Sequence, residues 1–486
     1  MLNKSTKSKK TENNSPKIPL RKILILAGAA LIFIFAGFTF LRALSFKKTQ
    51  NVTELSSEQV FELSNLLLSN YPLRYQVLKN LPYQINEPDL DVWAKAAIVV
   101  DTSTGCVLYQ KNADKVIPPA SMTKLFAMYV VEEEIAAGRF SYDQKIPLPP
   151  ESWACNMPPH SSLMFLGKDH QVTMEELLLG LSICSGNDAA YALAYTVSGS
   201  MEAFVEQMNL VAQDLGLSHT HFVESSGYSE QNQTTPREMA EFATIYIRRH
   251  PDSLRRFHSV LDFTYPKAHN LAPGDKIAAQ DFSQGFPAKI TMPITQENTN
   301  PLLAKLSGCD GLKTGFIDES GYNLALTAVR GETRFLSVTM GGPGKNTREG
   351  QAGRVHDGTE LMEWAFSNFA DYPLDLKVHS YLVRSFNSDC KMIRLVPAFS
   401  AHAITVPYIN GNSLSENLES VKVQVKLPDF CWGSVEQGKP YGNIIISLGD
   451  YVLDEIPLVA DRNAKKSNIF VSASDLLLSR IFQMNR

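Results

Sequence analysis

The sequence predicts an α+β protein, in which a first domain with an antiparallel sheet and helices is followed by a small β-rich domain. Two observations predict this class. β-rich runs lie at both ends of a mostly helical stretch between residues 96 and 340, and short alternating runs with turn signals between them fill residues 373–460. The chain has 486 residues, of which 44% are apolar and 20% charged, so it can bury the cores of two or three globular domains.

The N-terminus carries a signal for membrane insertion. Ile23–Leu41 is a run of 19 residues without a charge, and about 20 apolar residues suffice to span a bilayer. The polar tail at 1–22 is rich in lysine and has one acid, Glu12, whereas few basic residues follow the run. This asymmetry places the tail in the cytoplasm and the rest on the outer, periplasmic or extracellular, face. A cleaved signal peptide is the competing interpretation, but its apolar region is usually shorter and no convincing A-x-A site precedes Lys47.

The first domain is expected over residues 93–372, after a connecting segment at 42–92 that has some helical character. Its strands are predicted by β-rich runs on either side of turn residues, such as "TSTG" and "GET". Two hairpins follow from this pattern: 96–101 with 106–110, and 322–330 with 334–340.

Three helices are predicted between these hairpins. One begins in "PPASMTKLFAMYVV", Pro118–Val131, and another in "TMEELLLGL", where Thr173 and Glu176 have the spacing of a capping box. A third covers residues 200–217, where apolar residues recur every three or four positions and a glycine stands near the end.

The C-terminal part is expected to form a small β-rich domain at 373–470 and a short amphipathic helix at 471–486. The apolar residues of that helix are Leu477, Leu478, Ile481 and Phe482. The net charge of −4 gives no sign of a nucleic-acid partner. None of the six cysteines forms a CxxC pair, and His219 and His221 have no third ligand placed with them, so neither a metal nor another cofactor is expected.

Ser121 and Lys124 form the first chemical candidate, at the start of the first predicted helix. Residues three apart on a helix lie on one face, so these side chains can touch. Lysine can take the proton of a serine only if burial or a nearby positive charge lowers its pKa well below about 10.4, and the apolar neighbours Met122, Leu125 and Phe126 favour burial. A serine at a helix start also has a backbone N–H free to face a developing oxyanion.

The S-x-x-K pattern alone is weak, because it occurs three times, at Ser45–Lys48, Ser121–Lys124 and Ser388–Lys391. S-x-N is no rarer, whereas K-T-G occurs once, at Lys313–Gly315. Only Ser121, then Ser185, then Lys313 gives the three patterns in this order, and their settings are a helix start, a loop between two helices and a strand. The combined signal is strong.

In this order and setting the sequence resembles the serine-active-site enzymes of the penicillin-binding and β-lactamase superfamily, which share these three motifs. More closely, it is similar to the D-alanyl-D-alanine carboxypeptidases among the low-molecular-mass penicillin-binding proteins. The match is close over residues 93–370, for example at "AAIVVDTSTGCVLYQKNADKVIPPASMTK" and "GCDGLKTGF", and looser over 373–460. The resemblance implies a β-lactamase/transpeptidase-like catalytic domain that removes the terminal D-alanine from peptidoglycan stem pentapeptides, with β-lactams as covalent inhibitors.

Carried over by position, the resemblance implies a catalytic role for three residues. Ser121 is expected to be the acyl-accepting nucleophile, Lys124 its base, and Ser185 the relay of a proton to the leaving amine.

The resemblance also implies substrate-binding residues. Asn187 is expected to hold the substrate amide, and Lys313 to supply positive charge that helps to lower the pKa of Lys124. Thr314 is expected to line the cleft, and the backbone N–H of Phe316 to complete the oxyanion hole. Arg348 falls where the family places an arginine for the terminal carboxylate, a task that suits its bidentate fork.

Two positions depart from the family pattern. Ile317 stands where the family usually has threonine after the residue that follows K-T-G, which removes a hydroxyl from the strand. Glu224 stands where an asparagine is usual.

Three other functions compete with a carboxypeptidase. A class A β-lactamase shares the motifs but needs a glutamate for deacylation, typically in an E-x-x-L-N loop, and no such string lies between Asn187 and Lys313. A DD-endopeptidase that cuts cross-links uses the same machinery. A non-catalytic wall-binding scaffold need not retain Ser121, Lys124 and Ser185 together with Lys313, so their presence argues against it.

Overall fold

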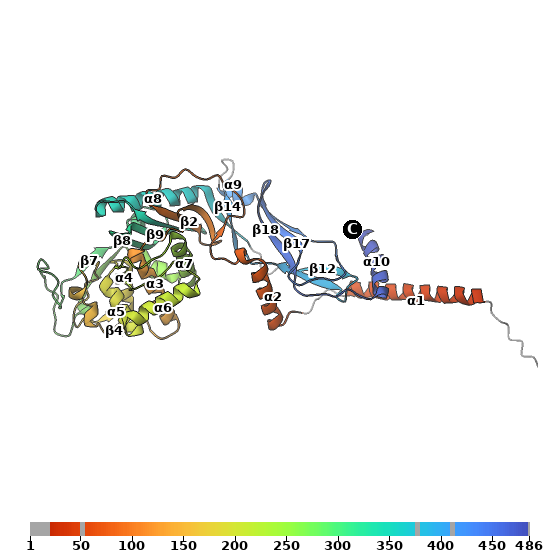
Figure 1. Ribbon diagram of the computed structural model, residues 1–486, viewed down its shortest axis with the longest axis horizontal. Coiled ribbons are helices and arrows are strands. Elements are labelled where there is room, and N and C mark those ends of the chain that lie inside the picture. Colours follow the sequence, from red (N-terminus) through yellow and green to blue (C-terminus); the bar gives the residue numbers. More distant parts are fainter. Residues whose placement is uncertain (1–19, 49–53, 375–379, 409–413, 485–486) are drawn as a thin grey trace, which may run out of the picture.

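The structure is a computed structural model that describes residues 20–48, 54–374, 380–408 and 414–484. Three parts follow one another along its long axis: a domain of helices around a sheet, a narrow β-rich domain, and the projecting helix α1 (Leu20–Lys48) (Figure 1). Most of the predicted cytoplasmic tail, residues 1–19, lies outside the described residues.

The sheet of the first domain contains both predicted hairpins. β2 (Ala96–Asp101) pairs with β3 (Cys106–Lys111), and β9 (Gly321–Arg330) pairs with β10 (Thr333–Gly342), all antiparallel. Antiparallel pairing of β10 with β2 joins the two hairpins into one sheet. Two strands complete the order β1-β3-β2-β10-β9-β8, namely β1 (Lys79–Asn80) and β8 (Cys309–Ile317).

Helices cover both faces of this sheet, which is why all six residues of β2 are buried. The side chains of Ala97 and Val99 pack with those of α8 (Thr347–Asn368), whereas Ile98 and Val100 belong to the core beneath the other face. That second core includes Phe126 of α3 (Lys124–Ala136) and Phe242 of α7 (Pro236–Arg249), whose rings stack with centroids 3.5 Å apart.

The predicted helix at 118–131 differs at its start. A tight 3-10 turn, η2 (Ala120–Thr123), precedes α3, so Ser121 lies in this turn and Lys124 is the first residue of the α-helix. Ala120 has a left-handed backbone with φ 50°, which breaks the regular helix before the serine.

Of three helices below the sheet, the first and the third carry the expected local signals (Figure 1). In α4 (Met174–Ser182) the capping box between Thr173 and Glu176 is present in both directions. α5 (Asn187–Ser198) follows after a short loop, and α6 (Met201–Asp214) is capped by the Ser200 side chain. Two small ribbons lie beside them: β4 (Lys145–Ile146) with β5 (Val172–Thr173), and β6 (Asp262–Tyr265) with β7 (Ile294–Glu297).

The β-rich domain is also confirmed. β11 (Phe369–Pro373) pairs with β14 (Ala403–Pro407), and a six-stranded sheet has the order β15-β17-β18-β13-β12-β16. The strands of this sheet are β12 (Tyr381–Phe386), β13 (Met392–Pro397), β15 (Val421–Lys426), β16 (Cys431–Trp432), β17 (Pro440–Leu448) and β18 (Tyr451–Ala460), with α9 (Leu414–Glu419) before β15.

Two helices pack against this domain: one precedes the first domain in the sequence, and the other lies at the C-terminal end. α2 (Ser57–Asn70), within the predicted connecting segment, buries Leu63 and Leu67 in the core of the β-rich domain. α10 (Ile469–Met484) corresponds to the predicted C-terminal helix and contacts α1 and β12. All six cysteines are free.

Candidate active site

Ser121 and Lys124 are in direct contact at the start of α3. The Nζ atom of Lys124 lies 2.9 Å from the Oγ atom of Ser121, 2.8 Å from Oδ1 of Asn187 and 2.5 Å from the backbone oxygen of Ser226. The last two atoms are acceptors only, so they take two N–H groups of the lysine. A neutral Lys124 therefore has its lone pair left for the hydroxyl proton of Ser121.

Burial favours this neutral form. The Lys124 side chain has no exposed surface, and burial lowers the pKa of Lys124 to about 7, against the opposing effect of the Glu224 and Asp188 carboxylates. Burial also lowers the pKa of Lys313 well below its ordinary value, with further lowering by Lys124 and Arg354. Burial is thus the main cause of the lowered pKa of both lysines, and repulsion by Lys124 adds to the lowering of the pKa of Lys313.

The loop between α4 and α5 brings the second motif to the same place. Ser185 is buried and holds a left-handed backbone with φ 57°, a conformation that non-glycine residues adopt rarely and often at functional sites. Asn187 begins α5, accepts a hydrogen bond from Lys124 and donates through Nδ2 to Oγ of Ser161 at 3.1 Å.

Asp188, the next residue, was missed by the sequence analysis. Its side chain is fully buried, and its two carboxylate oxygens accept hydrogen bonds from the backbone N–H groups of Met164, at 2.8 Å, and Leu166, at 3.0 Å. These contacts hold the neighbouring segment, whose Ser162 lines the cleft. An acid directly after S-x-N was the available signal, but its partners are distant in sequence.

The K-T-G motif lies on β8, as predicted, against the turn that carries Ser121. A Cβ atom on Gly315 would come 2.4 Å from the backbone oxygen of Pro119 and 3.2 Å from the backbone nitrogen of Ser121, so only glycine permits this approach. Phe316 follows, with its ring stacked on Tyr322 at a centroid distance of 4.3 Å. The Thr314 hydroxyl points elsewhere and donates to Thr299 at 2.8 Å.

A cleft of about 550 Å³ opens over these residues. Ser121, Asn187 and Phe316 line it, and Ile317, the departure noted above, lines it as well. Thr314 and Ser185 do not belong to its lining.

The predicted carboxylate ligand, Arg348, lies in the exposed first turn of α8 and is not among the residues that line this cleft. Six residues further along the helix, the buried Arg354 donates to the backbone oxygen of Gly315 at 2.5 Å and to that of Asn323 at 3.0 Å. The sequence analysis missed Arg354, whose contact with the K-T-G strand depends on the packing of α8.

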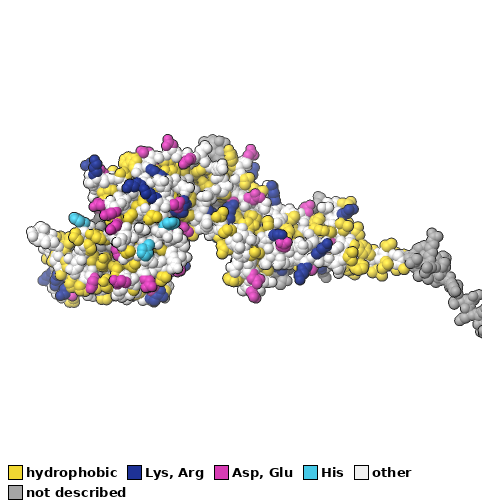
Figure 2. Space-filling view, viewed as in Figure 1, with side chains coloured by type: hydrophobic (Ala, Val, Ile, Leu, Met, Phe, Trp, Pro, Cys, Tyr) yellow, Lys and Arg dark blue, Asp and Glu magenta, His cyan; other side chains and the backbone are white. Residues whose placement is uncertain are grey.

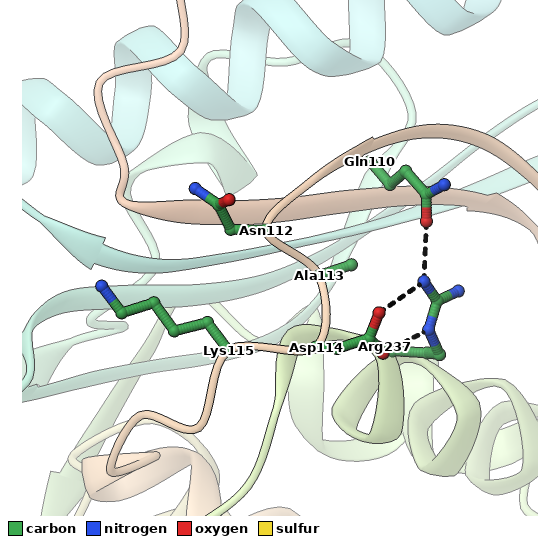
Figure 3. Close-up of a pocket in the computed structure, with 6 residues that line it drawn as sticks. All are labelled: Gln110, Asn112, Ala113, Asp114, Lys115 and Arg237. Atoms are coloured by element: carbon green, nitrogen blue, oxygen red, sulfur yellow. Dashed lines mark hydrogen bonds and ion pairs between the residues drawn. The ribbon is translucent and has the colours of Figure 1, made fainter.

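A second hollow lies at the end of β3 (Figure 3). Arg237 crosses it and donates to Asp114 at 2.6 Å and to Gln110 at 2.7 Å, so its charge is paired. This hollow contains none of the motif residues.

The rival S-x-x-K pair in the β-rich domain is not assembled. Lys391 contacts the hydroxyl of Ser45, and the Ser388 hydroxyl accepts a hydrogen bond from the backbone of Cys390 at 3.2 Å. Within the described ranges, no hydrogen bond joins Ser388 to Lys391.

Comparisons with known proteins agree with this geometry. The sequence profile of the peptidase family described as D-alanyl-D-alanine carboxypeptidase matches residues 83–344. The D-alanyl-D-alanine carboxypeptidase DacF of Bacillus subtilis is 28% identical over 77% of this chain and 86% of its own length. The D-alanyl-D-alanine carboxypeptidase DacC of Escherichia coli is 29% identical over 82% of this chain and 90% of its own length.

Solved structures show the same similarity over both domains. The crystal structure of penicillin binding protein 5 from Haemophilus influenzae is 27% identical and superposes with a TM-score of 0.62, covering 79% of this chain and 100% of that one. The D-alanyl-D-alanine carboxypeptidase DacD of Francisella tularensis is 25% identical, with a TM-score of 0.59 over 80% of this chain and 97% of that one.

Proposed function

This chain belongs to the D-alanyl-D-alanine carboxypeptidase family of serine peptidases, and we propose that Ser121, Lys124 and Ser185 carry out its reaction. The protein is a penicillin-binding DD-carboxypeptidase that acts on peptidoglycan stem peptides. The observation that carries the assignment of residues is the contact between the Ser121 hydroxyl and the fully buried amine of Lys124.

Acylation begins with a proton transfer. Neutral Lys124 takes the proton of Ser121, and the Oγ atom attacks the carbonyl carbon of the penultimate D-alanine. The backbone N–H groups of Ser121 and Phe316 are proposed to hold the oxyanion, because Gly315 lets β8 approach the turn of the serine closely.

The tetrahedral adduct then collapses. The bond to the terminal D-alanine breaks, and the leaving amine receives the proton, which we assign to relay from Lys124 through Ser185. Water later attacks the acyl-enzyme with Lys124 again as base, and this step releases the shortened peptide. Lys313, which is buried on the K-T-G strand, is proposed to supply N–H donors for the substrate.

Labelling with a penicillin followed by intact and peptide mass spectrometry tests this assignment. A stable adduct on the peptide that contains Ser121 is expected. Rapid release of the adduct would point to a β-lactamase, and the absence of any adduct would point to a non-catalytic scaffold and contradict the proposal.

Recognition of the free carboxylate separates a carboxypeptidase from an endopeptidase. We propose that Arg348 reaches this carboxylate, because the first turn of α8 packs on Tyr322, which stacks on Phe316 of the cleft. Arg354 has a different part in this proposal, since its hydrogen bonds to Gly315 and Asn323 hold β8 in place.

The Arg348→Ala variant is expected to lose about ten- to a hundredfold in kcat/KM on a peptide with a free C-terminus, which is the worth of a charge-assisted hydrogen bond. The loss should be smaller on the amidated analogue, and Arg348→Lys should restore only part of it because an ammonium lacks the bidentate fork.

Arg354→Lys is the matched control and should weaken both peptides equally, because it acts through β8. Equal losses for Arg348→Ala would remove Arg348 as the anchor and weaken the choice of carboxypeptidase over endopeptidase. A loss confined to the free acid in Arg354→Lys would transfer the role to Arg354.

We propose that α1 remains attached and holds the protein in the cytoplasmic membrane, with both domains on the outer face. Within α1, Ala27–Ser45 is long and apolar enough to cross a bilayer, and none of it is buried. Figure 2 shows hydrophobic side chains covering the described part of this projecting helix.

The arrangement of α10 supports the same placement. This helix buries its polar residues Ser474, Asp475 and Ser479 and turns apolar side chains such as Ile469 and Met484 outward. The Asp475 carboxylate accepts two hydrogen bonds from the guanidinium of Arg42, each 2.9 Å long, so the polar face of α10 lies against the end of α1 and the apolar side chains face outward beside it.

The full-length protein is expected to stay in the membrane fraction with residues 23–41 present, because no convincing cleavage site precedes Lys47. Membrane fractionation with N-terminal peptide analysis measures this. Removal of residues 1–48 should release far more protein than removal of α10. A mature chain that begins after Leu41 would show that the segment is a cleaved signal peptide.

A further inference from the structure

The turn from Glu224 to Ser229 forms a wall beside the catalytic pair, and the Glu224 carboxylate organises it. Its Oε2 atom accepts hydrogen bonds from the backbone nitrogen of Ser226 at 2.6 Å and from the Ser226 hydroxyl at 2.5 Å. Its Oε1 atom accepts from the backbone nitrogen of Gly227 at 2.7 Å and from Nδ2 of Asn232 at 2.9 Å.

Two residues of this turn touch the catalytic segment. The backbone oxygen of Ser226 accepts the hydrogen bond from Lys124 at 2.5 Å. Gly227, with φ 77°, packs so closely that a Cβ atom there would come 1.9 Å from the backbone oxygen of Ala120. Displacement of the turn would therefore displace the acceptor of Lys124.

The donors around Glu224 match the two oxygens of a carboxylate. Each carboxylate oxygen faces N–H or O–H donors, so an amide at this position would set its own N–H2 against one of those groups. The asparagine that is usual in the family is shorter and neutral. In this chain the corresponding residue, Glu224, carries a carboxylate near Lys124.

We propose that Glu224 is a positioning residue for the reaction, which fixes the Ser226 carbonyl against Lys124 and, through its charge, sets the pH at which Lys124 can act as base. The inference rests on the assignment of Lys124 as base. It concerns how this chain regulates that base.

The charges around Lys124 come from four elements. Glu224 faces it from the turn and Asp188 from α5, while Lys313 lies on β8 with Arg354 of α8 beyond it. After burial, which lowers the pKa of Lys124, Glu224 is the largest charge effect and raises it. Loss of the carboxylate should therefore let Lys124 become neutral at lower pH.

A matched pair of variants, Glu224→Asn and Glu224→Asp, separates charge from shape, because both shorten the side chain equally and only one keeps the charge. The measurement is the second-order rate of acylation by benzylpenicillin from pH 5 to 10, with the full chain in detergent. Glu206→Gln, which removes an exposed acid on α6 outside the lining of the cleft, is the control.

The midpoint of the acidic limb is expected at a pH about half a unit or more lower for Glu224→Asn than for Glu224→Asp, because Asn places no negative charge near Lys124. Both should lose about tenfold in the plateau rate as the Ser226 carbonyl shifts. Glu206→Gln should change neither.

The inference would be overturned if the acidic limbs of the two variants had the same midpoint, or if the midpoint of Glu224→Asn lay at higher pH. If the shorter side chains prevent folding, Glu224→Gln, which keeps the length and removes the charge, is compared with the wild type, and its acidic limb should again lie at lower pH. Failure of the assignment of Lys124 is distinguishable, because the wild-type profile would then lack a limb near pH 7.

Discussion

Replacement of Ser121 by alanine is expected to abolish penicillin labelling and to lower the release of D-alanine by a factor on the order of 10⁴ or more. The Oγ atom of Ser121 forms the covalent bond in the proposed mechanism, and no other serine hydroxyl among the described residues contacts a fully buried lysine. Intact mass spectrometry after incubation with penicillin measures the first effect directly.

The variant should remain folded, because Ser121 is only half-buried and its loss leaves Lys124 with Asn187 and Ser226 as partners. A melting temperature close to that of the wild type is the control. Ser388→Ala should keep full labelling. Labelling that persists in Ser121→Ala, above all at Ser388, would mean that the nucleophile is another residue.

Replacement of Lys124 by arginine or methionine is the second change with a large expected effect, a loss on the order of 10³-fold in acylation rate. A guanidinium stays charged at every accessible pH and a thioether is not a base, so neither accepts the serine proton. Loss of the rate in both variants with a folded protein would support the assignment, whereas substantial activity in Lys124→Met would contradict it.

The wild-type pH profile follows from the same residue. Burial lowers the pKa of Lys124 to about 7 and the neutral amine is the base, so acylation should rise with pH up to about 7 and then level off. Below this value each pH unit should reduce the rate by about tenfold, because the neutral fraction of Lys124 falls in that proportion.

Stability should also depend on pH through this lysine. The folded pKa is about 7, whereas the unfolded one is about 10.4, so between these values the unfolded chain binds more protons than the folded one. The contribution of Lys124 to the free energy of unfolding therefore increases with pH across this window. Lys124→Met should lack that increase in denaturant titrations.

Much of the fold follows from local signals in the sequence. The hairpin β2–β3, the capping box at Thr173 and Glu176 and the helix after Ser200 depend on residues close together in the chain. The placement of α2 could not be predicted in this way, because Leu63 and Leu67 pack with strands more than three hundred residues later.

In the candidate site, too, the motif residues could be predicted from the sequence, whereas contacts that depend on packing could not. The order of the three motifs predicted that Ser121, Lys124 and Asn187 would lie together, and the structure places them within hydrogen-bonding distance. The direction of a side chain on a strand depends on its neighbours across the sheet. The hydrogen bond from the Thr314 hydroxyl to Thr299 could therefore not be predicted from the sequence. Glu224 likewise acts through a turn that the sequence pattern does not define.

Release of D-alanine from a purified stem pentapeptide is the most direct measurement of the central claim. The full-length protein in detergent is expected to yield one free D-alanine and one tetrapeptide for each pentapeptide consumed. Prior incubation with benzylpenicillin should stop the reaction, and the Ser121→Ala protein should show none. A folded protein that forms the penicillin adduct on Ser121 but releases no D-alanine, while it cleaves cross-linked peptide dimers, would contradict the carboxypeptidase assignment.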